Sequence, residues 1–154
     1  MFESPDSFLA QIGRNKIVIA TAAAWAIAQT FKVMIGVVRE KRFNFRWFVG
    51  SGGMPSSHAA LATSLATSVG LYHGFDSALF AISLAFAVIT MFDAQGVRRQ
   101  SGQQAEALNK ILEDLYAHKG LQEERLKELF GHSPNEVFAG GILGITTALL
   151  FFNS

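Results

Sequence analysis

Four apolar stretches limit what this chain can fold into. They cover residues near 17–38, 57–72, 77–93 and 135–152, and each is nearly free of charged side chains. The first is long enough to cross a hydrocarbon core of about 30 Å as a helix that rises about 1.5 Å per residue. Four such stretches exceed what a single soluble core can bury in a chain of 154 residues. They predict an all-α integral membrane helical bundle with about four transmembrane helices.

The second and third stretches are shorter than the roughly 20 residues of a typical span. Taken alone, either one also suits a buried helix of a soluble protein. Only the polar turn "HGFDS" separates them, which favours an antiparallel helical hairpin. The alternative fold is a soluble all-α bundle with unusually apolar helices.

Charged residues are concentrated between the third and fourth stretches. Within residues 95–132, leucine and isoleucine recur at helical spacing and charges occupy the remaining positions, which predicts a solvated amphipathic helical segment broken near Gly120. We expect His73, His118 and His132 on the surface, because they lie in turns or on this segment. Residues 1–154 then form a single membrane domain.

The basic residues predict how the bundle is oriented. Four spans place the loop 39–57 and the segment 94–136 on one side of the membrane and both termini on the other. Of the 13 lysines and arginines, only Arg14 and Lys16 fall on the side of the termini, and Lys32 lies within a span. By the positive-inside rule the loops are cytoplasmic, as expected for an inner (plasma) membrane protein whose site faces the cytoplasm.

Composition excludes several classes of site. The chain has no cysteine, so it has no disulfide, thiolate metal site or cysteine nucleophile. Its net charge of +1 gives no reason to expect nucleic acid as a partner. No carboxylates and histidines show convincing metal-ligand spacing, so we expect neither a metal nor another cofactor.

Two basic residues share one face of the first span. Lys32 and Arg39 are seven residues apart, or about two helical turns, and can reach toward a common point near the membrane boundary. An ionisable group within a span is by default a functional candidate. The alternatives are that Lys32 snorkels to the boundary and that Arg39 only sets orientation or touches anionic lipid.

Polar residues also mark the ends of the next two spans. Pro55, Ser56, Ser57 and His58 open the second span, where free backbone N–H groups and serine hydroxyls suit an anion. The serines serve equally well as plain helix caps. Asp93 closes the third span, and Arg98 and Arg99 follow it. Three helix ends should therefore meet at one face and form a cradle for phosphate.

These motifs resemble those of the type 2 phosphatidic acid phosphatase superfamily, relatives of the vanadium haloperoxidases. The first family motif is lysine, six residues and arginine-proline; here Lys32 and Arg39 have that spacing, but Glu40 replaces the proline. The second is proline-serine-glycine-histidine, matched by "PSSH" with serine in place of glycine.

The third region places the chain nearer one branch of that superfamily. The string "MFDAQGVRRQSGQQAEALN" keeps Arg98, but Gln104 stands where the family has a histidine, and the closing aspartate is replaced around Leu108 and Asn109. With "GGMPSSH", it looks like the divergent branch of the superfamily, which consists of small membrane proteins. The resemblance covers most of the chain.

The resemblance implies roles for the matched residues. The basic residues hold the phosphate oxygens, the second-motif serine adds a hydrogen bond, and the histidine of that motif protonates the leaving oxygen. In this chain the roles fall to Lys32, Arg39, Arg98 with its neighbour Arg99, Ser56 or Ser57, and His58.

The family's nucleophilic histidine has no counterpart here, because a glutamine amide is a poor nucleophile. Three outcomes stay open. Asp93 attacks phosphorus or serves as the base for a water, with His58 as general acid. Alternatively, Gln104 orients a water for direct attack. In the third outcome the site binds a lipid phosphate without cleaving it.

We therefore expect a lipid phosphate or pyrophosphate phosphatase that hydrolyses a phosphomonoester or anhydride at the cytoplasmic face. One competing class is a non-catalytic lipid-phosphate-binding membrane protein; another is a small transporter or flippase component, suggested only by Lys32 and Asp93 in or near the spans. The small residues of 137–152 suit tight helix packing, either within one chain or in a homo-oligomer.

Overall fold

The computed structural model describes residues 7–41, 53–95, 104, 106–111 and 133–153. Within them, a short helix α1 (Phe8–Arg14) precedes four long helices, and no strand occurs. The long helices are α2 (Lys16–Glu40), α4 (Ser57–His73), α5 (Ala78–Gln95) and α7 (Pro134–Asn153). These ranges match the four apolar stretches to within a few residues, so the predicted all-α bundle is confirmed.

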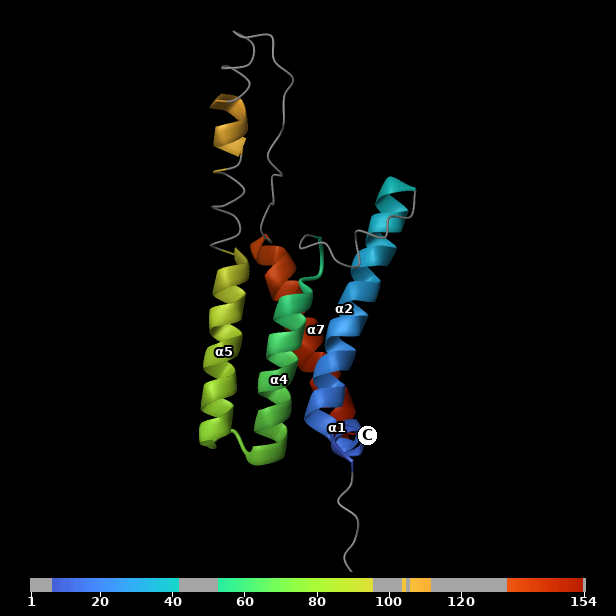
Figure 1. The fold of residues 1–154 in the computed structure, drawn as a ribbon, viewed down its shortest axis with the longest axis vertical. Helices are drawn as coiled ribbons and strands as arrows, with labels where there is room; N and C mark the ends of the chain where they lie inside the picture. The colour runs from blue at the N-terminus through green and yellow to red at the C-terminus, as the bar shows by residue number, and fades with distance from the viewer. Residues whose placement is uncertain (1–6, 42–52, 96–103, 105, 112–132, 154) are drawn as a thin grey trace, which may run out of the picture.

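Successive long helices run in opposite directions, as Figure 1 shows. One end of the bundle holds the end of α2, the start of α4, the end of α5 and the start of α7; we refer to it as the loop end. The opposite end holds the start of α2, the α4–α5 turn and the end of α7, together with α1; we refer to it as the terminal end. The first and last described helical segments, α1 and the end of α7, therefore lie at the same end of the bundle.

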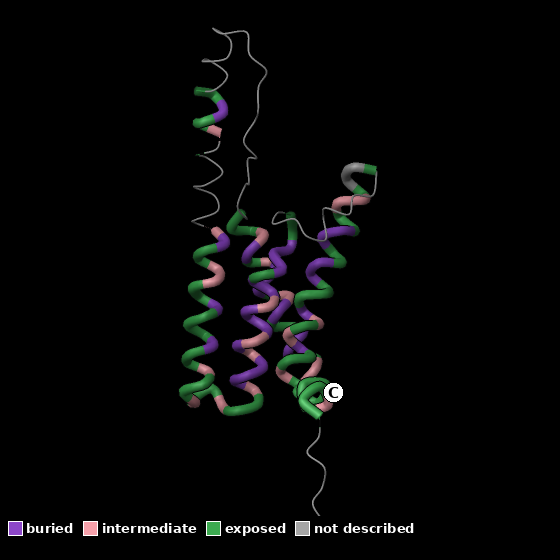
Figure 2. The backbone as a smooth tube through the Cα atoms, in the orientation of Figure 1, coloured by how far each residue is buried: buried purple, intermediate pink, exposed green. Residues whose placement is uncertain are grey.

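α4 occupies the centre of the bundle, because it packs against α2, α5 and α7. Figure 2 shows buried positions along most of α4, and these positions carry almost only small side chains. The buried residues are Ser57, Ala59, Ala60, Ala62, Thr63, Ser64, Ala66, Ser68, Val69 and Gly70. Small residues let helix backbones approach closely, which is the main source of packing energy between helices in lipid.

Two glycines of α7 bring it close to α4. A Cβ added to Gly140 would collide with the carbonyl oxygen of Ser56, and one added to Gly144 would collide with the carbonyl oxygen of Ala60. Thr63 reinforces this contact, because its hydroxyl donates to the Gly141 carbonyl at 3.0 Å. The small residues of α7 are therefore used for packing within one chain.

The outward faces of the bundle are apolar. Large exposed side chains cover α5 and α7, with Ile89 67%, Phe92 73% and Phe138 69% accessible. Helices Lys16–Val38, Ala78–Gln95 and Pro134–Asn153 are long and apolar enough to cross a membrane. α4 is shorter, at 17 residues, and is surrounded by the other three. The bundle thus has small and polar groups inside and large apolar groups outside. This arrangement is expected in lipid rather than in water.

The turn between α4 and α5 forms the predicted hairpin. Gly74 ends α4 with φ +92°, a conformation that favours glycine. Ser77 then starts α5, because its hydroxyl accepts the Phe80 N–H at 3.2 Å. Most of the predicted amphipathic segment 95–132 lies outside the described residues. Its described part is helical at 104 and 106–111, with an ion pair between Lys110 and Glu106 at 3.1 Å.

Candidate functional site at the loop end

The start of α4, the end of α5 and the start of α7 meet at the loop end, whereas the sequence analysis grouped the first two with the end of the first span. The backbone N–H of Ser56, just before α4, donates to the carbonyl of Glu136 in the first turn of α7 at 2.9 Å. Ala59 of α4, Ala94 of α5 and Val137 of α7 form one buried cluster. These contacts hold the start of α4 between the end of α5 and the start of α7.

The start of α4 is buried although it is polar. The Ser56 hydroxyl caps the helix by accepting the Ala59 N–H at 3.4 Å. Ser56 is 0% exposed and Ser57 is 3% exposed. The first N–H groups of a helix carry a partial positive charge and favour an anion. Ser56 is therefore the helix cap, and the two buried hydroxyls with the helix start suit a phosphate ligand.

Lys32 of α2 reaches the loop that leads into α4. The lysine is 6% exposed, and a Cβ built on Gly53 would lie 3.3 Å from its Cγ and 3.7 Å from its Cδ. Gly53 has φ +93°, so both its conformation and its neighbour require a residue without a side chain. Lys32 of the family-like first motif is thus adjacent in space to Gly53, which precedes the second motif, although these two residues are 21 positions apart in the sequence.

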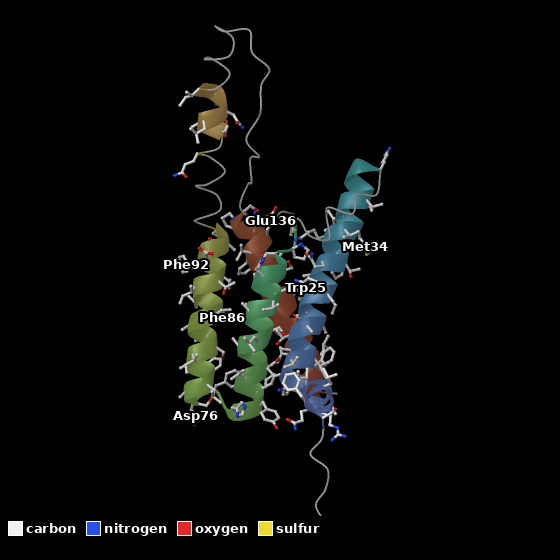
Figure 3. All side chains as sticks on the ribbon, viewed as in Figure 1. Trp25, Met34, Asp76, Phe86, Phe92 and Glu136 are labelled. Atoms are coloured by element: carbon white, nitrogen blue, oxygen red, sulfur yellow. The ribbon has the colours of Figure 1, made fainter. Side chains whose placement is uncertain are left out.

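Glu136 interacts with the start of α7, with Lys32 and with Ser56, and the sequence analysis did not select it. Its carboxylate accepts the Ser133 N–H at 3.1 Å, and the Ser133 hydroxyl accepts the Glu136 N–H at 3.4 Å. This reciprocal pair is a capping box that starts α7. The charge of Glu136 also acts on Lys32, and its carbonyl accepts the Ser56 N–H. The signal in the sequence was the Ser133-x-x-Glu136 spacing. Figure 3 shows Glu136 at the loop end.

His58 and Asp93 lie at the same end but on the outside of the helices. Both residues are exposed. Each directly adjoins a member of the buried cluster, since His58 precedes Ala59 and Asp93 precedes Ala94. The cluster therefore places the backbones of His58 and Asp93 at the same level of the bundle, beside the buried start of α4.

The other predicted site residues are not brought to this point by the described structure. Arg39 belongs to α2, two turns beyond Lys32, but its side chain is not described. Arg98 and Arg99 lie outside the described residues. Gln104 is exposed and belongs to the short helix that Figure 1 draws beyond the end of α5.

The described arrangement contains groups that suit an anion. It combines a buried amine, a capped helix start and two buried hydroxyls, and one carboxylate, Glu136, acts on the amine. In the part of the chain that the structure describes, no three histidine, aspartate or glutamate side chains come together as a metal site requires.

Comparison with known proteins identifies the family. Residues 13–147 match the model of the divergent PAP2 family. The chain is also 44% identical over 147 residues to the membrane protein YuiD of Bacillus subtilis (strain 168), an alignment that covers 88% of this chain and 93% of YuiD. No solved structure shows significant similarity to it. The family match includes Lys32, the start of α4 and Glu136, so the candidate site lies within the shared region. The chain is a membrane protein of the divergent PAP2 family.

Proposed function

We propose that this protein binds the phosphate of a phosphorylated lipid at the loop end and hydrolyses its phosphomonoester or anhydride bond. The observation that carries the proposal is the buried Lys32 beside Gly53, next to the buried and serine-capped start of α4. A lysine within a span is costly unless it is paired or serves a ligand. Phosphate oxygens match both the amine and the helix start.

Each residue has a defined task in the proposed reaction. Lys32 and the start of α4 hold the phosphoryl oxygens and stabilise the charge that develops on them. The Asp93 carboxylate takes a proton from a water, whose oxygen forms the new bond to phosphorus. The bond from phosphorus to the leaving oxygen breaks, and the His58 imidazolium donates its proton to that oxygen. His58 and Asp93 each precede a residue of the buried cluster of Ala59, Ala94 and Val137, and this common level in the bundle supports the division of roles.

The membrane side follows from the charge distribution. Of the 13 lysines and arginines, Arg14 and Lys16 lie at the terminal end. The positive-inside rule then places the loop end in the cytoplasm, at an inner membrane. Cysteines introduced by Asn44→Cys and His118→Cys should resist an impermeant thiol reagent applied outside intact cells. Labelling of either one from outside would contradict this orientation.

A second candidate function is phosphate binding without hydrolysis. The observation in its favour is Gln104, which replaces the family's histidine and lies exposed beyond α5. A binding protein needs the cradle of Lys32 and the α4 start, but it needs neither a proton donor nor a base.

One assay tests both functions. Purified protein in nanodiscs is given a phosphatidic acid, a phosphatidylglycerol phosphate and an isoprenoid diphosphate, and released phosphate is measured. We expect His58→Ala and Asp93→Asn to lower kcat by about 10²- to 10⁴-fold with little change in KM. We expect Lys32→Met to weaken binding of the lipid itself.

Matched variants provide the controls. Asp76→Asn makes the same change as Asp93→Asn but at the terminal end, where Figure 3 shows Asp76, and Lys110→Met removes an exposed lysine. Both should behave like wild type. Release that survives His58→Ala and Asp93→Asn would contradict the assigned roles. Absence of release from every lipid, with saturable binding that Lys32→Met abolishes, would establish the binding function instead.

A further inference from the structure

A second polar cavity opens at the terminal end, far from the candidate site. Its volume is about 580 Å³, within the range of small-molecule sites. It lies where α1, the start of α2 and the end of α4 come together. Its polar lining residues are Gln11, Arg14, Asn15, Lys16, Tyr72 and His73.

The charge of this cavity favours an anion. Arg14 ends α1, Lys16 begins α2 and His73 ends α4. No acidic residue is found among the described residues that line the cavity. The side chain of Asn15 already accepts the Ile17 and Val18 N–H groups at 3.0 and 3.2 Å. The attraction for an anion therefore comes from the basic side chains, with the α2 dipole adding to it.

A buried hydroxyl, that of Ser68, lies one helical turn from this polar lining without being part of it. Ser68 is 0% exposed, and its Oγ has no hydrogen-bond partner among the described residues. It lies one turn before the lining residue Tyr72, on the same face of α4. One turn earlier in α4, the Ser64 hydroxyl donates to the Ala20 carbonyl at 3.2 Å. Along α4, Ser68 therefore lies between this hydrogen bond and the lining residue Tyr72.

The surroundings of the cavity place it at the membrane boundary. α1 exposes Phe8 at 74% and Leu9 at 76%, an apolar surface beside the polar lining residues of the same helix. The ring of Tyr72 packs edge-on against Phe152, with 6.5 Å between centroids. Apolar surface on a short helix and a tyrosine at the end of a span are features of the interface between lipid and water.

We infer that this terminal-end cavity binds a phosphate-bearing anion, either the head group of a membrane lipid or free phosphate. Arg14 and Lys16 form charged hydrogen bonds to the phosphate oxygens, and His73 and Tyr72 complete the site as donors. The inference is independent of the proposed function, because no residue is shared between the two sites.

The test measures binding at this site alone. In protein carrying Lys32→Met, which disables the loop-end site, titration calorimetry in a non-ionic detergent is performed with dihexanoyl phosphatidic acid and with inorganic phosphate. We expect one saturable site per chain. Adding Arg14→Gln and Lys16→Gln should weaken it by at least about tenfold, because two charge-assisted hydrogen bonds are lost. His73→Gln is an independent variant and should weaken binding less.

A matched pair separates this site from general attraction of anions to a basic protein. Lys41→Gln with Lys110→Gln removes the same charge elsewhere and should leave the affinity unchanged. Binding of both probes, with loss in the Arg14/Lys16 variant, indicates a phosphate site. If only the lipid binds, and the Arg14/Lys16 double variant loses that binding, the ligand is the lipid head group. The inference is overturned if neither probe binds, or if the two double variants have equal affinity.

Discussion

Gly140 and Gly144 should set the distance between α4 and α7, and alanine at either position should loosen the bundle. Gly144 lies against the carbonyl oxygen of Ala60, and Gly140 lies against that of Ser56. A backbone carbonyl cannot rotate away as a side chain can, so an added methyl group must push the two helices apart.

The third glycine of this helix is a built-in control. A Cβ on Gly141 would lie 3.7 Å from Met91 Cε and 3.7 Å from Thr63 Cγ2, which is ordinary van der Waals contact. Gly141→Ala therefore keeps the helix packing and gains the helix propensity of alanine, about 1 kcal/mol. The three substitutions share one chemistry and one helix, and they differ only in the space available.

The expected magnitude follows from these contacts. Overpacking costs about 1–3 kcal/mol, and the upper end applies where the obstacle is backbone. Separating the helices also stretches the bonds from Thr63 to the Gly141 carbonyl, 3.0 Å, and from Ser56 to the Glu136 carbonyl, 2.9 Å. After the gain in helix propensity, we expect Gly140→Ala and Gly144→Ala to lower the free energy of unfolding by about 2 kcal/mol each. Gly141→Ala should be neutral or stabilising.

The free energy of unfolding is measured by titrating SDS into mixed micelles and following the loss of helix. Gly13→Ala serves as a further reference, because nothing lies within 4 Å of its Cβ position. The reasoning is refuted if Gly144→Ala is as stable as Gly141→Ala, because the glycine–carbonyl contact would then not control the approach of the helices.

Three further substitutions test the loop end, each read out by calorimetric titration with inorganic phosphate and by SDS unfolding. Gly53→Ala should weaken phosphate binding by displacing Lys32. Gly74→Ala is the control, because Gly74 has nearly the same φ but lies at the other end of the bundle, so it should lower stability without affecting binding. An equal loss of binding in both variants would contradict the contact between Gly53 and Lys32. Ser56→Ala should lower the free energy of unfolding by about 1 kcal/mol through loss of the α4 cap, and an unchanged value would mean that the cap contributes nothing. Glu136→Gln should preserve the capping box, since glutamine also forms it. It should raise the affinity for phosphate, because the negative charge that acts on Lys32 is removed. A reduced affinity would show instead that Glu136 positions the lysine.

Much of the fold could be predicted because its signals are local. Apolar length predicted the four long helices, and the "HGFDS" turn predicted the α4–α5 hairpin. Helices in lipid satisfy their own backbone hydrogen bonds, so their existence and approximate limits depend mainly on composition along the chain.

The candidate site was predictable only in part. The motif spacing selected Lys32 and the α4 start, both of which the structure buries and brings together. It did not select Glu136, because a capping box reads as a purely local feature of α7. It grouped Gln104 with the site through the family pattern, whereas the described structure places that residue in a separate short helix.

The sequence by itself determined the helices, their number and their alternating direction, because hydropathy and turn residues act over a few neighbouring positions. Only the tertiary structure decided that α4 lies at the centre, that Gly140 and Gly144 face its carbonyls, and that Arg14, Lys16 and His73 surround one cavity. Those outcomes depend on which helix faces meet, and in lipid that choice rests on close shape complementarity between small residues far apart in the chain.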